Sequence, residues 1–222
     1  MKSILFVVAH PDDVAFGMGG TALLLKGKVE LHVICATKGE RGVFGKSLAE
    51  AGAIREREAM EESRRLGAQL YFLDRIDKEV FADRETSQKV ADLIIAIDPV
   101  AIFTIWPVDT HPDHSAISEV AKKGIFLSGK DPELIFSEEG ADQTSHFKPD
   151  MYVDTATVID QAMELIRVHK SQNRDDEIAQ ACLEKSLLRG KESGYPHAEG
   201  FMTLLNSNAS SILQTLRHVQ RS

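Results

Sequence analysis

The sequence predicts an α/β fold: a Rossmann-like, three-layer, doubly wound arrangement around a mostly parallel sheet. Two observations support this expectation. Short apolar runs without polar alternation, such as SILFVVA at Ser3–Ala9 and VAIFTIW at Val100–Trp106, are typical of parallel strands covered on both faces. These runs alternate with segments of helical spacing, and such a succession favours a parallel sheet with right-handed crossovers.

Strands and helices alternate regularly through the first 126 residues. The expected strands are Ser3–Ala9, Val29–Ala36, Gln69–Leu73 and Val100–Trp106. The expected helices are Gly17–Lys26, Leu48–Leu66, Arg84–Ile97 and Ser115–Phe126. Gly67 ends the second helix, Pro99 follows the third, and Pro107 stops the fourth strand, as expected for residues that interrupt regular structure.

The remaining residues, 127–222, have a less regular pattern. Short strands are expected at Leu134–Phe136 and, at the sheet edge, at Met151–Asp154; helices are expected at Val158–His169 and Asp175–Gly190. No repeat, low-complexity tract or linker interrupts the chain. We therefore predict a single domain over 1–222, with core βα units in 1–126 and a substrate-side loop plus C-terminal strand and helices in 127–222.

Composition excludes some partners and compartments. The 222 residues have a formal net charge of −8 and no basic stripe, which argues against a nucleic-acid or anionic-membrane partner. No window of 18 apolar residues and no signal-peptide pattern is found, so stable membrane insertion is not expected. Cys35 and Cys182 lie far apart within apolar patterns, and we expect buried thiols in a reducing cytoplasm.

A His-Pro-Asp motif follows a buried strand at two places in the chain. The first is His10-Pro11-Asp12-Asp13, and the second is His111-Pro112-Asp113-His114. Ligands of doubly wound sheets bind outside the carboxyl ends of the strands, where the strand order reverses. With the strand order 3-2-1-4-5, the first and fourth strands are neighbours. The two motifs are then expected to face each other across that crevice.

These residue types predict a divalent metal site. Two imidazoles and one carboxylate suit Zn²⁺ with a fourth position left for water, as in catalytic zinc sites. The resulting charge would help to lower the pKa of a bound water. Adjacent residues of an extended turn do not both reach one ion, so one of Asp12 and Asp13 is expected to be a ligand and the other a general base. The run Gly17-Met18-Gly19-Gly20 lacks dinucleotide-binding spacing, and we interpret it as close packing of a helix start against the sheet.

AHPDD followed by GMGG, with HPDH after a later strand, resembles the PIG-L/LmbE family of zinc-dependent de-N-acetylases. The similarity covers nearly the whole chain. It includes the supporting segments TKGERG, AIREREAMEESRRLG, KPDMYVDTATVID, HKSQ and GYPHAEGF. The resemblance implies an LmbE-like fold and a hydrolase that removes the N-acetyl group from an N-acetylglucosamine-containing substrate, releasing acetate and a free amine.

The resemblance also implies a role for each motif residue. His10, Asp13 and His114 would be the zinc ligands, with Fe²⁺ or another divalent cation as alternatives. Asp12 would be the general base. His111 would stabilise the oxyanion or protonate the leaving amine, oriented by Asp113.

Substrate contacts are implied for several further residues. Arg55 would contact substrate hydroxyls or support the acidic site, with a surface ion pair as the alternative. Glu40 and the loop Arg41–Ser47 would face the sugar, with a solvated loop as the alternative. Tyr195 and Glu199 would line the pocket, with a purely structural position as the alternative. His169 has a favourable position near a helix C-terminus as its structural alternative. One departure is Val14, where the family often has Glu, so a residue that supports a metal ligand is missing there.

The alternatives to an N-acetylglucosamine deacetylase are a zinc amidase for another N-acyl substrate, such as a thiol conjugate or an acylated glycoside, and a metal- or sugar-binding protein without catalysis. The expected partner is a small N-acetylated amino sugar. Related enzymes are often homo-oligomers, although no apolar stripe in this sequence indicates one.

Overall fold

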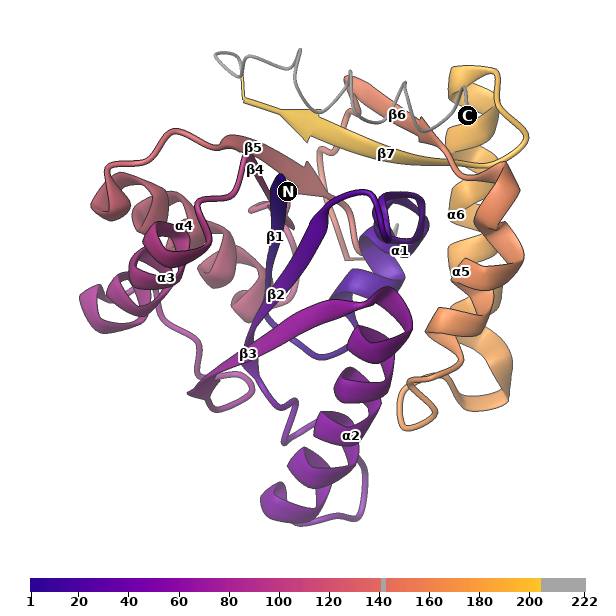
Figure 1. Ribbon diagram of the computed structural model, residues 1–222. Coiled ribbons are helices and arrows are strands. Elements are labelled where there is room, and N and C mark those ends of the chain that lie inside the picture. Colours follow the sequence, from indigo (N-terminus) through magenta and orange to yellow (C-terminus); the bar gives the residue numbers. More distant parts are fainter. Residues whose placement is uncertain (141–142, 205–222) are drawn as a thin grey trace.

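The computed structural model describes residues 1–140 and 143–204, whose strands form one seven-stranded sheet with helices on both faces (Figure 1). The strands are β1 (Ser3–Val8), β2 (Glu30–Thr37), β3 (Ala68–Arg75), β4 (Ala101–Ile105), β5 (Glu133–Ser137), β6 (Met151–Asp154) and β7 (Ala198–Thr203). The helices are α1 (Asp13–Leu25), α2 (Leu48–Leu66), α3 (Arg84–Ile97), α4 (Pro112–Ser128), α5 (Ile159–Ile166) and α6 (Glu177–Ser193), with short 3₁₀ turns η1 (Ala156–Val158) and η2 (Arg174–Asp176).

The strand order is β3-β2-β1-β4-β5-β7-β6. Strands β1 to β5 pair in parallel, and β7 is antiparallel to both β5 and β6. The doubly wound, mostly parallel sheet predicted from the sequence is therefore confirmed, including the 3-2-1-4-5 order and the edge position of Met151–Asp154. Strand β7 was not predicted, because Gly200 interrupts a segment with little β-branched character.

The sheet separates two layers of helices, as Figure 1 shows, and an apolar cluster lies on each face of the sheet. Helices α3 and α4 cover one face, where Leu5 and Val7 of β1 pack with residues such as Val90 and Ile117. Helices α1, α5 and α6, with the end of α2, cover the other face, where Ile4, Phe6 and Val8 point. Every residue of β1 is buried, which explains its uninterrupted apolar run.

Helix α1 begins earlier than predicted and is broken in its middle. It starts at Asp13, and the GMGG run lies inside it, with Met18 in a non-helical conformation (φ −153°, ψ 21°). The Lys185 ammonium donates to the Phe16 carbonyl just before the break, at 2.8 Å. A cation at that position complements the carbonyl end of the first half of the helix.

The second half of α1 has its own N-terminal partner. The Glu199 carboxylate accepts the backbone N–H groups of Gly20 and Thr21 at 2.7 and 2.8 Å, as an N-capping group does. A Cβ atom on Gly20 would lie 2.7 Å from the Thr155 side chain. The glycines therefore leave room for the side chains of Thr155 and Glu199 beside the break in α1. They do not mark the start of the helix. Glu199 has the structural role that was its alternative interpretation.

No helix within residues 1–140 and 143–204 is long and apolar enough to cross a membrane.

Candidate metal centre and active site

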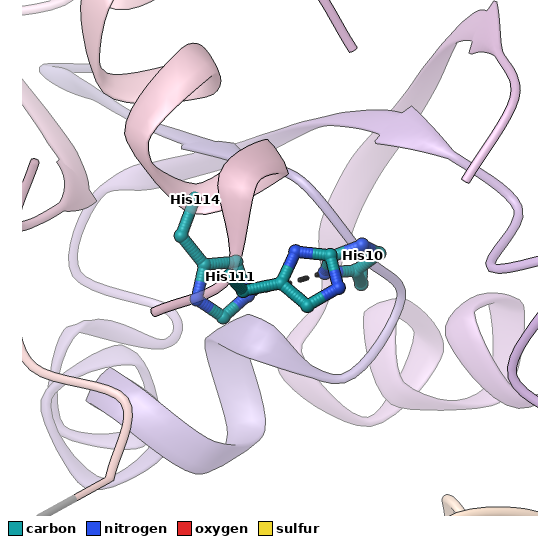
Figure 2. Close-up of side chains that lie close together, drawn as sticks. All are labelled: His10, His111 and His114. Carbon is teal, nitrogen blue, oxygen red and sulfur yellow. Dashed lines mark hydrogen bonds between the residues drawn. The ribbon is translucent and has the colours of Figure 1, made fainter. Parts of the chain in front are cut away.

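The two His-Pro-Asp motifs meet at the carboxyl edge of the sheet (Figure 2). His10 follows β1, and His114 lies in the first turn of α4, which follows β4. Strands β1 and β4 pair directly, so the two loops are neighbours. The Nδ1 atom of His10 lies 3.2 Å from the Nε2 atom of His114. The predicted convergence of these loops is confirmed.

Asp13 completes a triangle with the two imidazoles. Its Oδ1 atom lies 3.6 Å from Nδ1 of His10 and 3.6 Å from Nε2 of His114. Its Oδ2 atom accepts the backbone N–H groups of Ala9 and His10 at 2.9 and 2.8 Å, which fixes the carboxylate. Ligand atoms around a tetrahedral zinc ion with bonds of about 2.1 Å lie about 3.4 Å apart. The three atoms therefore have separations that suit a divalent cation.

Two other sets of potential ligands lie close together, with atoms within 4.8 Å of one another. They are His10 with His111 and His114, and His10 with Asp77 and Asp113. The second set surrounds the Nε2 atom of His10, which lies 3.3 Å from Asp113 Oδ2 and 3.4 Å from Asp77 Oδ1. One nitrogen of this ring thus faces His114 and Asp13, and the other faces two carboxylates. Histidine ligands typically donate their second ring N–H in this way, so we retain His10, Asp13 and His114 as the predicted ligand set.

This arrangement corrects the expected contact of Asp113. Its carboxylate approaches the ring of His10, and it also accepts the backbone N–H groups of Lys78 at 2.7 Å and Val80 at 3.3 Å. Only its backbone N–H contacts His111, by donating to Nδ1 at 3.3 Å. The reason is that the Asp113 side chain points from the first turn of α4 toward β1. It can therefore orient His10, and it does not hold the ring of His111.

The charge distribution around the cluster favours a cation. Burial lowers the pKa of His114, but the negative charge of Asp13 and the hydrogen bond to Asp109 outweigh burial and raise this pKa to about 10. For His10, burial is likewise outweighed by Asp13 and Asp113, and its pKa lies well above the ordinary value. Burial would raise the pKa of Asp13, but the two imidazoles hold it well below its usual range. The negative charge that stabilises protons on these imidazoles would also stabilise a metal ion that displaces those protons.

Asp109 supports the second imidazole and was missed by the sequence analysis. Its Oδ1 atom lies 3.0 Å from Nδ1 of His114, and its Oδ2 atom accepts the Thr144 hydroxyl at 2.9 Å. It also accepts the backbone N–H of His111 at 2.8 Å. The only signal available in the sequence was an acidic residue shortly before HPDH in the loop PVDTHPDH.

Asp12 is paired with Arg55 from α2. Both side chains are buried, and the Arg55 guanidinium donates to Oδ1 of Asp12 and to the Gly39 carbonyl. Arg55 contacts the acidic site and also lines the cavity, so both of its expected roles stay predictions, whereas its burial excludes the surface ion pair. The arginine fixes the position of the Asp12 carboxylate, which lies beside the cluster where a general base is expected.

His111 lies half-buried beside the cluster. The centroid of its ring is 4.6 Å from that of His10 and 4.8 Å from that of His114. Burial lowers its pKa, and positive charge on the two neighbouring rings lowers it further. Because Nδ1 accepts the Asp113 backbone N–H, Nε2 is the nitrogen that remains for a ligand.

A cavity of about 630 Å³ opens over the cluster. Its lining includes His10, Asp12, Asp13, Arg55, His111 and His114. Its other walls come from the loops after β2, β3 and β5 and from α6, and they include Arg41, Asp77, Glu139 and Lys185. A volume of this size suits a small organic ligand.

Five of the sequence-predicted residues lie outside this cavity lining: Asp113 and Glu199, described above, and Glu40, Tyr195 and His169. Glu40 is half-buried and accepts the backbone N–H of Asp77 at 3.1 Å, so it links two cavity loops. Tyr195 follows the end of α6 and is 39% exposed. His169 is fully buried, with Nε2 2.8 Å from Oε2 of Glu62, and it has a structural position.

The PIG-L family model, described as GlcNAc-PI de-N-acetylase, matches residues 5–125. The chain is 29% identical over 222 residues to diacetylchitobiose deacetylase of Thermococcus kodakarensis, covering 90% of this chain and 82% of that protein. It is 28% identical over 192 residues to 4-oxalmesaconate hydratase of Pseudomonas putida, covering 77% and 74%. The solved structure of N,N'-diacetylchitobiose deacetylase from Pyrococcus horikoshii has a TM-score of 0.83 and 26% identity, covering 91% and 84%.

Proposed function

The chain belongs to the PIG-L family of de-N-acetylases, and on that premise we propose that it hydrolyses the N-acetyl group of an N-acetylglucosamine-containing substrate. The observation that carries the proposal is the meeting of His10, Asp13 and His114 beside Asp12 at the floor of one cavity. The diacetylchitobiose deacetylases among its relatives support this substrate class.

We assign the cation to His10, Asp13 and His114, with Zn²⁺ as the expected ion and Fe²⁺ as the alternative. When bound, the cation would acidify a water molecule and polarise the acyl oxygen. Asp12, whose carboxylate contacts the Arg55 guanidinium, takes a proton from the attacking water. The Nε2 atom of His111 faces the developing oxyanion or the leaving nitrogen. The water oxygen forms a bond to the acyl carbon, the C–N bond breaks, acetate leaves, and the proton taken by Asp12 passes to the amine.

The hydratase relative raises a second candidate, addition of water to an unsaturated carboxylic acid. The charges of the cavity favour the first. Arg55 pairs with Asp12, Arg189 pairs with Glu138, and the Lys185 ammonium donates to backbone carbonyls. These three cations are already engaged, and Arg41, another residue of the lining, pairs with Glu79. Lys78 is then the lining cation whose ammonium has neither an ion pair nor a hydrogen bond among the described residues, and a single cation offers little to a polyanionic acid, whereas a neutral amino sugar needs no counter-charge.

The test is a panel assay for acetate and free amine. Diacetylchitobiose, simple N-acetylglucosaminides and N-acetylglucosaminyl-malate are incubated with the enzyme, with and without a chelator. We expect release of acetate and amine in equal amounts, lost on chelation and restored by Zn²⁺. Release of neither product from any member of the panel, by protein with a full complement of metal, would contradict the proposal. Hydration of 4-oxalmesaconate under the same conditions would favour the second candidate.

We also propose a cytoplasmic location and assembly as a homo-oligomer. Cys35 and Cys182 are both free and buried, which supports a reducing cytoplasm. A homo-oligomer is expected only from the family resemblance.

A further inference from the structure

Glu139 is a buried acid in the cavity wall that the proposed mechanism does not use. It lies two residues beyond β5, lines the cavity, and is only 6% exposed. Its Oε1 atom is buried without a hydrogen-bond partner among residues 1–140 and 143–204. The neighbouring cations are committed elsewhere: the Lys185 ammonium donates to backbone carbonyls, and Arg189 pairs with Glu138.

The position of Glu139 is nevertheless well defined. Its backbone N–H donates to the Thr144 hydroxyl at 3.1 Å, and its carbonyl accepts from the Lys185 ammonium at 2.5 Å. Thr144 in turn donates to Asp109, the residue that supports His114. A Cβ atom on Gly17 would lie 2.6 Å from Oε1 of Glu139, so the absence of a side chain at Gly17 makes room for the carboxyl group.

A buried carboxyl oxygen without a hydrogen-bond partner destabilises a fold and needs a physical explanation. Burial raises the pKa of Glu139 well above its ordinary value, and the negative charge of Asp13 raises it further. A neutral carboxyl group both donates and accepts hydrogen bonds, as a sugar hydroxyl does.

The topology places Glu139 where it can contact the substrate beyond the reacting amide. The metal ligands follow β1 and β4, whereas Asp77 follows β3 and Glu139 follows β5 on the opposite side of them. A ligand in this cavity can therefore extend from the cluster toward β5. We propose that Glu139 is a specificity-determining residue that hydrogen-bonds to a hydroxyl of the sugar unit bearing the acetamide. This inference rests on the proposed function.

The experiment measures kcat and KM of the metal-loaded enzyme for an N-acetylglucosaminide and for its 3-, 4- and 6-deoxy analogues. Glu139→Ala is expected to raise KM for the parent substrate about tenfold, the size of one good hydrogen bond, while kcat changes less than about threefold. For one deoxy analogue this increase should disappear, because the bond is already absent. Glu139→Gln, which keeps a donor and an acceptor, should restore most of the affinity.

Glu133 provides a matched control. It stands at the other end of β5, is buried, and has both carboxyl oxygens without a partner among the described residues. Glu133→Ala should leave KM unchanged for every substrate, whatever it does to the melting temperature. Gly17→Ala is a second probe that displaces the Glu139 carboxyl without deleting it, and it should reproduce the KM increase for the parent substrate.

An unchanged KM in Glu139→Ala, or an equal increase for the parent and all three analogues, would overturn the inference. Melting temperature and metal content show whether Glu139→Ala folds. If it does not, Gly17→Ala takes its place, and an unchanged KM or an equal increase for the parent and all three analogues would again overturn the inference. Acetate release by the wild-type enzyme tests the proposed function separately. An active wild type with unaffected Glu139 variants would refute the role of Glu139 and leave the deacetylase assignment intact.

Discussion

The Nδ1 atom of His10 and the Nε2 atom of His114 lie 3.2 Å apart, although 104 positions separate the two residues in the chain. Two imidazole nitrogens at this distance must share a proton or a cation, since their lone pairs would otherwise repel each other. Asp13, 3.6 Å from both nitrogens, supplies negative charge at the same point. A divalent ion satisfies all three groups at once, and this is the basis of the first prediction.

Replacing His114 should abolish tight metal binding. His114→Ala removes one of three ligand atoms and leaves only His10 and Asp13, so we expect metal affinity to fall more than about 100-fold, beyond the range for losing a supporting residue. Metal content after desalting and competition titration with a chelator measure this loss. His146→Asn changes an exposed histidine of the loop after β5 and should keep one equivalent of metal. Undiminished affinity in His114→Ala would rule out the ligand set.

Asp12→Asn should separate metal binding from catalysis. The amide keeps the shape of Asp12 but accepts no proton, so kcat should fall by about 10²–10⁴ while metal content stays at the wild-type level. Arg55 also loses its buried counter-charge, and the free energy of unfolding should drop by about 3–5 kcal/mol. Acetate release, metal analysis and urea denaturation give the three readings.

The control for this variant is Glu61→Gln on the exposed side of α2. It breaks the pairs of Glu61 with Arg64 and Arg65, and exposed pairs of this kind contribute less than about 1 kcal/mol. Its kcat should equal that of the wild type. Wild-type kcat in Asp12→Asn would show that the general base lies elsewhere.

Asp113→Asn tests the corrected contact of this residue. Because the Asp113 carboxylate faces Nε2 of His10, we expect metal affinity to fall about 10–100-fold, the usual effect of removing a group that orients a ligand. Competition titration measures this change directly. The opposite pattern, unchanged metal affinity with a reduced kcat, would favour the original expectation that Asp113 acts through His111.

Much of the sheet could be predicted because its strands are buried on both faces and therefore read as apolar runs. The run at Ser3–Ala9 and the His-Pro-Asp motif behind it established both a central strand and the position of the site. Strand β7 could not be found in this way, because its pairing with β5 and β6 depends on tertiary packing more than on its own composition. The start of α1 was also missed, because the expected helix began with the glycines at Gly17, whereas the observed helix begins at Asp13 inside the His-Pro-Asp-Asp motif.

The site shows the same difference between residues that local sequence identifies and residues that only the tertiary fold brings together. His10, Asp13 and His114 belong to motifs whose spacing indicates their chemistry. Asp77 and Glu139 belong to no motif, and they reach the cavity only because β3 and β5 end at the same edge of the sheet as β1. Local sequence also cannot show which carboxylate points to which imidazole. The direction of Asp113 depends on the backbone N–H groups of Lys78 and Val80, which come from a different loop.

His169 and Glu62 form a buried pair, and they predict a pH-dependent stability that is independent of metal. Burial lowers the pKa of His169, but the hydrogen bond and charge of Glu62 outweigh it and raise the pKa above the ordinary value. Burial also raises the pKa of Glu62. In both cases the folded state holds protons more tightly than the unfolded state. The stabilisation from this pair is therefore fully present at a pH below the pKa values that the two groups have in the unfolded state. It is lost as pH rises through the higher pKa values that they have in the folded state.

Glu62→Gln should accordingly lower the free energy of unfolding by about 1–3 kcal/mol near pH 6, because a buried hydrogen bond to a charged group is lost. The difference in the free energy of unfolding between Glu62→Gln and the wild type should become smaller as pH rises above about 6.5, the ordinary pKa of histidine. Urea denaturation of chelator-treated protein at several pH values measures it. In Glu61→Gln the corresponding difference should stay constant over this range, because the pKa of Glu61 is about 2. A difference between Glu62→Gln and wild type that widened with pH would mean that the folded pair releases protons rather than holding them.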